Sequence, residues 1–307
     1  MNSRTSLWQI LSERVDPRII YLLVALALAF PLVQDVRLPA AEMPAASALF
    51  EAVEQLTPEP GKIVVVAMDW GAGTSAENGP QTMVALEHLF RRRIPFAVVS
   101  LYAQAAPMLK EVPQKVARIL EKEFPGEKWV YGKDWVNLGY QPQSQIFVQS
   151  FSSAKDIHEL MKTDANGVPL AEVPLMANVH TIKDVQMLMQ FTGLVGVFDV
   201  WIQLFQGQGY RPPMVHGCTS ITIPDAYLYY ASNQIVGFFE GIAGAAWYDK
   251  LLNQKAPTRK VEHATKINSG LAFAQIVILV LIVLGNIGYF MAKWTDGGAK
   301  HPVVGGS

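Results

Sequence analysis

Two apolar runs lie at opposite ends of the chain, and they constrain its fold more than any local motif does. The first covers residues 19–33, and the second extends from Gly270 to Ala292 without a charged residue. At about 1.5 Å per residue, the second run is long enough to cross a hydrocarbon core of about 30 Å. The sequence therefore predicts a domain held at a membrane surface between two anchoring helices.

The first run has two interpretations. It contains Pro31, and its flanks fit a cleaved signal peptide, with arginines in residues 1–18 before it and small residues at 39–41 after it. We favour a retained anchor, because the preceding segment is long for a signal peptide and contains an amphipathic stretch around Trp8, a residue suited to the membrane interface.

The basic residues give conflicting signals about orientation. Three arginines precede the first run and only Arg37 follows it closely, which places the N-terminus in the cytoplasm and the domain outside. Basic residues are denser before the second run than after it, which favours a cytoplasmic domain with a lipid-facing basic segment. The first helix usually dominates, so we expect a two-span protein of the bacterial inner (cytoplasmic) membrane with an extracytoplasmic domain.

Between the apolar runs, strand-like and helix-like patterns alternate. Residues 62–68 and 94–100 read as buried strands, and helical spacing follows each of them. Further strands are expected at 145–150, 185–191 (a stretch that also fits a helix) and 213–216, and helices at 49–56, 80–92, 108–124, 154–162, 197–205, 224–232 and 234–252. This alternation predicts an α/β, Rossmann-like three-layer domain with a mostly parallel sheet, flanked by N- and C-terminal transmembrane helices.

The expected segments follow from these patterns. In chain order they are a cytoplasmic segment (1–18), a first transmembrane helix (19–34), a linker with a helix (35–60), the α/β domain (61–252), a basic linker (253–268), a second transmembrane helix (269–293) and a C-terminal tail (294–307).

Composition narrows the classes of function. The formal net charge of −1 provides no basic field, so no nucleic-acid partner is expected. A single cysteine excludes an intrachain disulfide framework and a Cys-rich zinc or iron–sulfur site. We expect neither a cofactor nor a metal.

Asp69, Gly71 and Gly73 are candidate ligand-binding residues. They follow the first expected strand, and open α/β sheets bind ligands outside the carboxyl ends of their strands. The turn lacks the dinucleotide and P-loop motifs, so neither of those ligands is indicated. The alternative is that Asp69 caps the turn and has no ligand.

The stretch from Gly132 to Tyr140 is rich in hydrogen-bonding side chains. Asp134, Asn137 and Tyr140 are therefore further candidates for ligand binding, and Tyr140 is suited to an amphipathic contact. The alternative is a structured connection in which Asp134 and Asn137 bind backbone groups.

Cys218 follows a short expected strand, and His180 lies elsewhere in the chain. A thiolate with a neighbouring imidazole would make a Cys/His hydrolase of the caspase-like type, although no signature of that class surrounds Cys218. The alternative is a structural cysteine and a loop histidine.

Small residues mark a candidate interaction face in the expected helix 234–252. Gly237, Gly241 and Ala245 recur every four residues with Gly244 beside them, which suits a contact face for a second protein chain or the membrane surface. The alternative is close packing on the domain's own sheet. In the second apolar run, the uncharged polar residues Gln275 and Asn286 are candidates for hydrogen bonds to a neighbouring helix.

Four strings together resemble an uncharacterised family of prokaryotic membrane-anchored α/β proteins with two flanking transmembrane helices. They are residues 18–23, 132–140, 233–246 and 284–290. The resemblance implies this architecture and no activity. We therefore expect a non-catalytic scaffold or accessory subunit, which contacts other membrane subunits and the lipid bilayer and also suits a homo-oligomer. The alternatives are the tethered hydrolase and a small-molecule-sensing domain.

Overall fold

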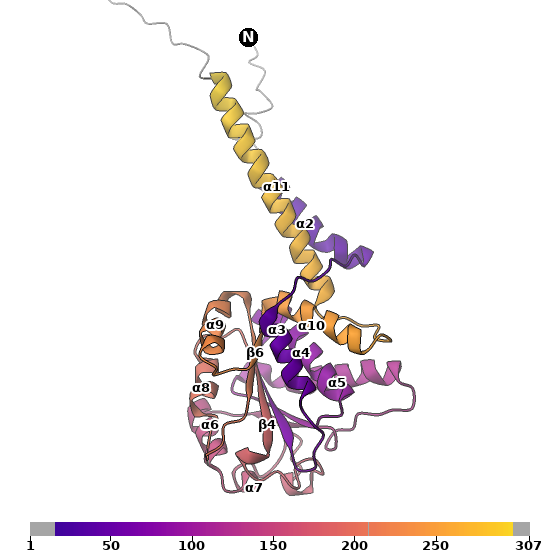
Figure 1. Cartoon of the computed structure of the whole chain (residues 1–307), viewed down its shortest axis with the longest axis vertical. Coiled ribbons are helices and arrows are strands. Elements are labelled where there is room, and N and C mark those ends of the chain that lie inside the picture. The colour runs from indigo at the N-terminus through magenta and orange to yellow at the C-terminus, as the bar shows by residue number, and fades with distance from the viewer. Residues whose placement is uncertain (1–15, 208, 297–307) are drawn as a thin grey trace, which may run out of the picture. The chain divides into compact units, whose positions relative to one another are not determined.

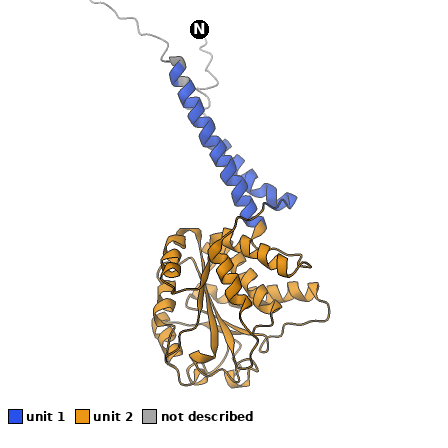
Figure 2. Cartoon of the chain, viewed as in Figure 1, with its two compact units in different colours: residues 1–38, 266–307 blue, residues 39–265 orange. Residues whose placement is uncertain are grey.

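The computed structural model of the chain describes residues 16–207 and 209–296. Contacts divide it into two units, one of residues 39–265 and one of residues 1–38 and 266–307 (Figure 2). Most of the expected N-terminal segment and most of the C-terminal tail lie outside the described residues.

The larger unit is built on a six-stranded sheet in which every strand pair is parallel. The spatial order is β3-β2-β1-β4-β5-β6. All seven residues of β1 are buried, because both faces of the sheet are covered and its β-branched side chains pack on either side. The strands are β1 (Ile63–Asp69), β2 (Phe96–Ser100), β3 (Trp135–Tyr140), β4 (Val185–Thr192), β5 (Met214–Cys218) and β6 (Gly237–Glu240). The expected α/β class with a parallel sheet is thus confirmed.

Helices cover both faces of the sheet (Figure 1). One layer contains α3 (Pro44–Glu54), α4 (Ser75–Arg91), α5 (Ala106–Glu123) and α10 (Gly241–Lys255). The other contains α6 (Ser144–Ser153), α8 (Val197–Leu204) and α9 (Ile223–Ala231), and α7 (Ile157–Leu160) lies near the amino end of β4. The short helices η1 (Ala72–Thr74), η2 (Ala103–Ala105), η3 (Leu170–Glu172), η4 (Ile182–Asp184) and η5 (Ser220–Thr222) lie in the connections.

Three expected elements are wrong or shortened. Residues 145–150 lie in α6 and form no strand, because Phe147, Val148 and Phe151 face the core at helical spacing. Only Ile157–Leu160 of the expected helix 154–162 is helical. The expected helix 234–252 is instead β6 followed by α10, and Gly241 joins them with a φ of 58°.

The residues between α10 and the C-terminal helix pack into the larger unit through buried charges. The side chain of Arg259 is 1% exposed and bonds Glu87 at 2.8 Å and Asp249, and His263 Nε2 lies 2.8 Å from Glu87. Burial alone would raise the pKa of Glu87, but its bonds to His263 and Arg259 lower that pKa well below the usual range. Asp249 also accepts a hydrogen bond from the backbone N–H of Ala264 at 2.7 Å. Four buried charged or titratable side chains therefore hold this stretch in place.

The described residues of the smaller unit form two helices, α2 (Pro17–Gln34) and α11 (Thr265–Asp296). Both are long and apolar enough to cross a membrane, by length and composition. Within this unit the helices contact each other, since the Phe30 and Phe273 rings lie 5.7 Å apart and Gly270 lies against the backbone of Leu28. Gly270 has no side chain, so the two helix backbones can approach closely at this point.

Candidate functional site

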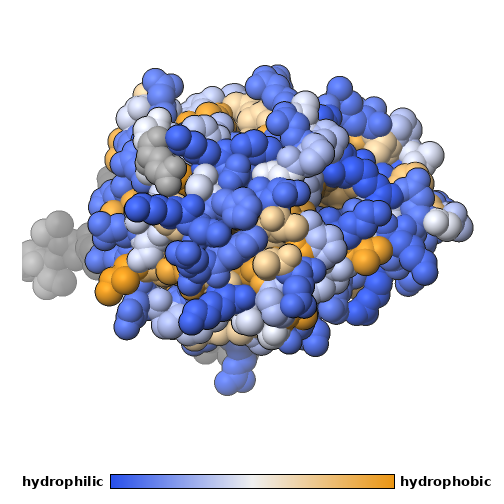
Figure 3. Space-filling model, turned by 90° about the horizontal axis from the view of Figure 1, so that it is seen from below, coloured by the Kyte–Doolittle hydropathy of each residue, from blue (hydrophilic) through white to orange (hydrophobic). Residues whose placement is uncertain are grey.

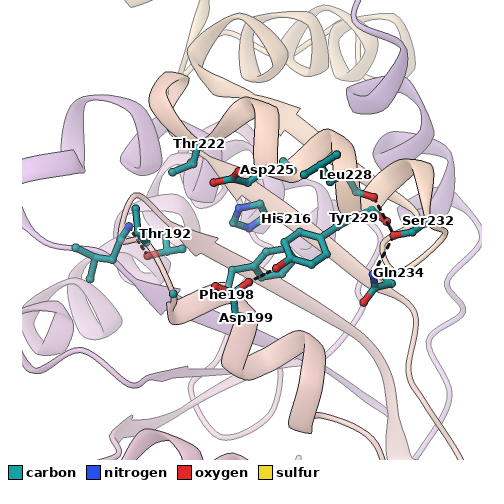
Figure 4. Close-up of a pocket in the computed structure, with 14 residues that line it drawn as sticks. Thr192, Phe198, Asp199, His216, Thr222, Asp225, Leu228, Tyr229, Ser232 and Gln234 are labelled. Atoms are coloured by element: carbon teal, nitrogen blue, oxygen red, sulfur yellow. Dashed lines mark hydrogen bonds between the residues drawn. The ribbon is translucent and has the colours of Figure 1, made fainter.

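A pocket of about 490 Å³ opens at the carboxyl ends of β4 and β5, between α8 and α9 (Figure 4). Thr192 ends β4, and His216 lies on β5 at the floor of the pocket. Helix α8 contributes Phe198 and Asp199, and α9 contributes Asp225 and Tyr229 among others. Carboxyl ends of parallel strands are the usual place for a ligand in such sheets.

His216 is fixed in one neutral tautomer. Its Nδ1 atom lies 3.1 Å from the backbone oxygen of Gln190, which accepts but cannot donate, so Nδ1 carries the hydrogen and Nε2 presents a lone pair. Burial lowers the pKa of His216 to about 3, so the ring is neutral at pH 7. The ring stacks on Phe198 with 3.8 Å between centroids and 4° between planes. The pocket floor is therefore a rigid, neutral, hydrogen-bond-accepting surface.

The remaining polar groups give the pocket an acidic character. Asp199 and Asp225 lie on either side of His216 in Figure 4, and the hydroxyl of Tyr229 donates a hydrogen bond to Asp199. That bond, with burial, raises the pKa of Tyr229 to about 12, so its hydroxyl stays protonated. Within the described residues, no lysine or arginine lines the pocket. Its only charged side chains there are thus carboxylates.

The rim of the pocket is apolar and open to solvent. Val195 is 82% exposed in the connection after β4, and Leu228 is 70% exposed on α9. A ligand with a charged or polar end and an apolar body would match both the floor and the rim.

Asp69 lies at the carboxyl end of β1, as expected, but it is fully buried. Burial raises its pKa, although four hydrogen bonds oppose that effect. The donors, all from the domain itself, are the Leu101 backbone at 2.6 Å, Trp201 Nε1 at 2.8 Å, and Ser100 and Gln190 at 3.0 Å each. Asp69 thus ties the end of β1 to the end of β2, to β4 and to α8, and its side chain bonds these elements rather than the turn that it was expected to cap.

The crevice between the ends of β1 and β4 is closed by side chains. A Cβ placed on Gly193 would lie 2.6 Å from methyl carbons of both Thr74 and Thr219. Glu77, in the first turn of α4, accepts hydrogen bonds from the backbone and hydroxyl of Ser220. A carboxylate therefore stands at the helix N-terminus where a phosphate would bind in a nucleotide site.

The other predicted ligand-binding residues do not converge on one site. Asp134 lies before β3 at the amino edge of the sheet, where it accepts from the Val130 backbone at 2.6 Å. Asn137 accepts from the Gly139 backbone at 2.8 Å, and Tyr140 is half-exposed at the end of the strand. Gly71 packs against Tyr102 and Gln104, and Gly73 faces open space.

Cys218 and His180 lie at opposite ends of the strands, Cys218 at the carboxyl ends and His180 at the amino ends. Cys218 ends β5 with no exposed surface, and its thiol donates to the Phe239 backbone oxygen at 3.1 Å. Burial raises the pKa of Cys218 to about 12, so the thiolate is absent at neutral pH. His180 precedes β4 and pairs with Asp156 at 3.2 Å. The geometry that a Cys/His hydrolase requires is not present in this pair.

The small residues expected to form an interaction face are buried inside the domain. Gly237 lies in β6, where an added Cβ would meet the backbone nitrogen of Leu49 at 2.3 Å, so it makes room for α3. Gly241, Gly244 and Ala245 are also buried. In α11, Asn286 donates to Ile282 of its own helix and Gln275 is exposed. Residues 237, 241, 244 and 245 thus pack within the domain, as the alternative of close packing on its own sheet expects, and a contact face for a second chain stays a prediction.

Sequence reasoning missed most of the pocket. The sequence could have indicated the pocket through the connections after the expected strands 185–191 and 213–216, because residues in such connections lie at the carboxyl ends of the strands. The polar residues of α8 and α9, Asp199, Asp225 and Tyr229, come from helices whose facing sides no short motif marks.

In comparisons with known proteins, no family, no curated protein and no solved structure matches this chain. The resemblance to a membrane-anchored family stays a prediction.

Proposed function

We propose that the chain is a membrane-anchored, non-catalytic accessory subunit whose domain binds a small organic cation in the pocket between α8 and α9. One observation carries this proposal: the pocket offers two carboxylates and a neutral acceptor nitrogen, without a basic side chain among the described residues that line it. Binding of this ligand is how the subunit would respond to its surroundings and signal to a partner.

The chemistry of the lining favours a cation over an anion. Asp199 and Asp225 would repel an anion, and the donors among the described lining residues, such as Thr222 and Gln234, carry no positive charge to offset that repulsion. A protonated amine would instead bond a carboxylate and donate to the lone pair on His216 Nε2. The Tyr229 and Phe198 rings suit the apolar body of such a ligand.

The state of Cys218 supports a non-catalytic role over the hydrolase. Its thiol is buried and protonated, and it lies at the carboxyl end of β5, whereas His180 lies before the amino end of β4. The accessory role extends the expectation from the sequence that the chain works with other membrane subunits, or with a second copy, in contact with the bilayer.

The finer architecture belongs to the same proposal. The strand order 3-2-1-4-5-6 with helices on both faces supports a Rossmann-like three-layer domain. The two apolar helices support two spans, which we assign to a bacterial inner membrane, and the arginines before the first span support a domain outside the cytoplasm.

Isothermal titration of the full chain in detergent micelles tests the ligand class. The probes are tyramine and choline as cations, with benzoate as the anion of similar size. We expect a saturable binding signal for at least one cation and none for benzoate, and at least a tenfold weaker affinity in Asp225→Asn.

Glu121→Gln is the matched control, because it removes one negative charge from α5 in the opposite helix layer. It should bind the cation as the parent does. Equal affinity of the parent and Asp225→Asn, preferential binding of benzoate, or binding of neither cation would reject the proposal.

A further inference from the structure

Three potential metal ligands meet in the connection between α6 and β4. They are Asp156, His158 and His180, and one ligand atom from each lies within 4.8 Å of the others. This connection contains only short helical pieces, α7, η3 and η4. The cluster lies at the amino edge of the sheet, away from the pocket between α8 and α9.

The two segments that carry these ligands are joined by the backbone. The N–H of Ile157 donates to the carbonyl oxygen of His180 at 2.7 Å, which places Asp156 and His158 beside His180. On the other side, the N–H of His180 donates to Asp184 at 3.0 Å, within a capping box formed by Thr181 and Asp184. The three side chains therefore start from fixed backbone positions.

The tautomer of His158 leaves the lone pair of its Nδ1 atom available to bind a metal ion. Its Nε2 atom lies 2.9 Å from the backbone oxygen of Met176, so Nε2 carries the hydrogen and Nδ1 presents its lone pair. Metal-bound histidines in proteins are held in this way, with the second ring nitrogen donating to a carbonyl or carboxylate oxygen. The Met176 carbonyl thus orients His158 toward the cluster.

Both imidazoles direct Nδ1 to the same carboxylate oxygen. Asp156 Oδ1 lies 3.2 Å from His180 Nδ1 and 4.0 Å from His158 Nδ1. The backbone N–H of His158, and then His180, lower the pKa of Asp156, so its carboxylate is ionised at neutral pH. An ion pair between Asp156 and His180 would account for those two residues, and the bond to Met176 holds the second imidazole, that of His158, with its Nδ1 lone pair toward the same carboxylate.

We propose that Asp156, His158 and His180 form a binding site for a divalent transition-metal ion of the zinc class. Two imidazoles and one carboxylate suit zinc, cobalt(II) and nickel(II), and water would occupy the remaining positions. Ligand atoms about 2 Å from zinc lie roughly 3.4 Å apart, whereas these atoms lie within 4.8 Å of one another, so binding requires the widest pair to close by up to about 1.4 Å.

Solvent reaches the site. The His180 side chain is 48% exposed, whereas that of His158 is 14% exposed, so His180 is the ligand free to close over the ion. The end of the domain that carries α7, at the bottom of Figure 1, presents a mostly hydrophilic surface (Figure 3). A bound ion would join the two segments of a connection that is otherwise held by few regular elements.

Cobalt(II) and zinc titrations of the full chain, purified without an affinity tag and freed of metal with a chelator, test this site. We expect one equivalent of cobalt to bind with visible d–d absorption bands, zinc to displace it, and either ion to raise the melting temperature. His158→Gln should weaken binding at least tenfold, since Gln keeps a donor for the Met176 carbonyl and lacks the Nδ1 ligand.

Asp156→Asn and Glu159→Gln complete the design. Asn keeps the N-cap of α7 but is a weaker ligand, so we expect weaker binding with an unchanged melting temperature in the absence of metal. Glu159 is exposed and adjacent, so Glu159→Gln removes a nearby charge without removing a ligand. Cobalt binding that is absent in the parent, or equal in the parent, His158→Gln and Asp156→Asn, overturns the proposal.

Discussion

Two buried histidines govern how the domain responds to acid. Burial lowers the pKa of His88 to about 4 and that of His216 to about 3, against an ordinary value of about 6.5. His88 is 1% exposed, stacked on Phe50, and within 2.7 Å of Glu54. In the unfolded chain both rings gain a proton near pH 6.5, whereas the folded chain excludes that proton until the pH is far lower.

We therefore predict that the free energy of unfolding falls as the pH is lowered from about 6.5 toward 4. The stabilising contribution is complete above pH 6.5, because both rings are then neutral in both states, and it is lost through the window down to the lowered pKa values. For His88 alone the loss is roughly 3 kcal/mol. Urea unfolding at pH 7, 6, 5 and 4 measures it, and His216→Phe should show a shallower slope. A slope that is the same in both proteins contradicts the assignment of His216.

At the scale of elements, the junction of β6 with α3 depends on the absence of one side chain. We predict that Gly237→Ala lowers the free energy of unfolding by about 2–4 kcal/mol, because its Cβ would meet the Leu49 backbone, which cannot move as a side-chain end does. Gly73→Ala is the control, since a Cβ there meets no atom within 4 Å. Thermal unfolding compares the two, and equal melting temperatures would contradict this packing.

The elements that the sequence marks most clearly share one property: a long, strongly patterned run. Strand β1 and helices α4 and α5 are of this kind, and their existence was predicted. Strand β6 has only four residues, and its neighbours β5 and α3 bury it, so its structure depends on contacts that no local pattern contains. Residues of α6 were predicted as a strand because Phe147 and Val148 have a local preference for strands. Packing of these side chains against the core stabilises a helix instead.

The same reasoning explains the outcome for the candidate sites. Asp69 was placed correctly at a strand end, but only the structure shows that four donors of the domain already surround it. His158 and His180 are separated by more than twenty residues, and their proximity depends on the hydrogen bond from Ile157 to the His180 carbonyl. No short motif connects them, so the sequence indicated no metal site.

At the scale of the whole molecule, the ion pairs around Arg259 predict where the domain ends. Expressed alone, residues 39–265 should fold cooperatively, whereas residues 39–255 should lose at least 3 kcal/mol of stability or fail to fold. The shorter fragment lacks Arg259 and His263, so the buried Asp249 loses its ion pair with Arg259, and the buried Glu87 loses both of these partners and keeps Arg91. Circular dichroism and urea unfolding compare the fragments, and equal stabilities would support the boundary at residue 252 predicted from the sequence.

The predicted orientation is open to a labelling test in intact cells. Lys128→Cys in a Cys218→Ala background introduces one thiol at an exposed position of the larger unit. An impermeant maleimide added from outside, after the outer membrane is permeabilised, should label it completely. Labelling only after lysis of the inner membrane would place the domain in the cytoplasm.

The contact between α3 and β6 has a consequence for how the chain folds during its synthesis on the ribosome. Helix α3 is the first element of the domain to leave the ribosome, and β6, with Gly237 under Leu49 and Glu240 bonding the Ala45 backbone at 3.2 Å, is the last strand. At synthesis rates of about 5–20 residues per second, α3 waits on the order of ten seconds or more for its partner, with its apolar face uncovered. During that interval the nascent chain is open to chaperones and to misassociation, and a domain with this closure should fold after translation rather than along with it.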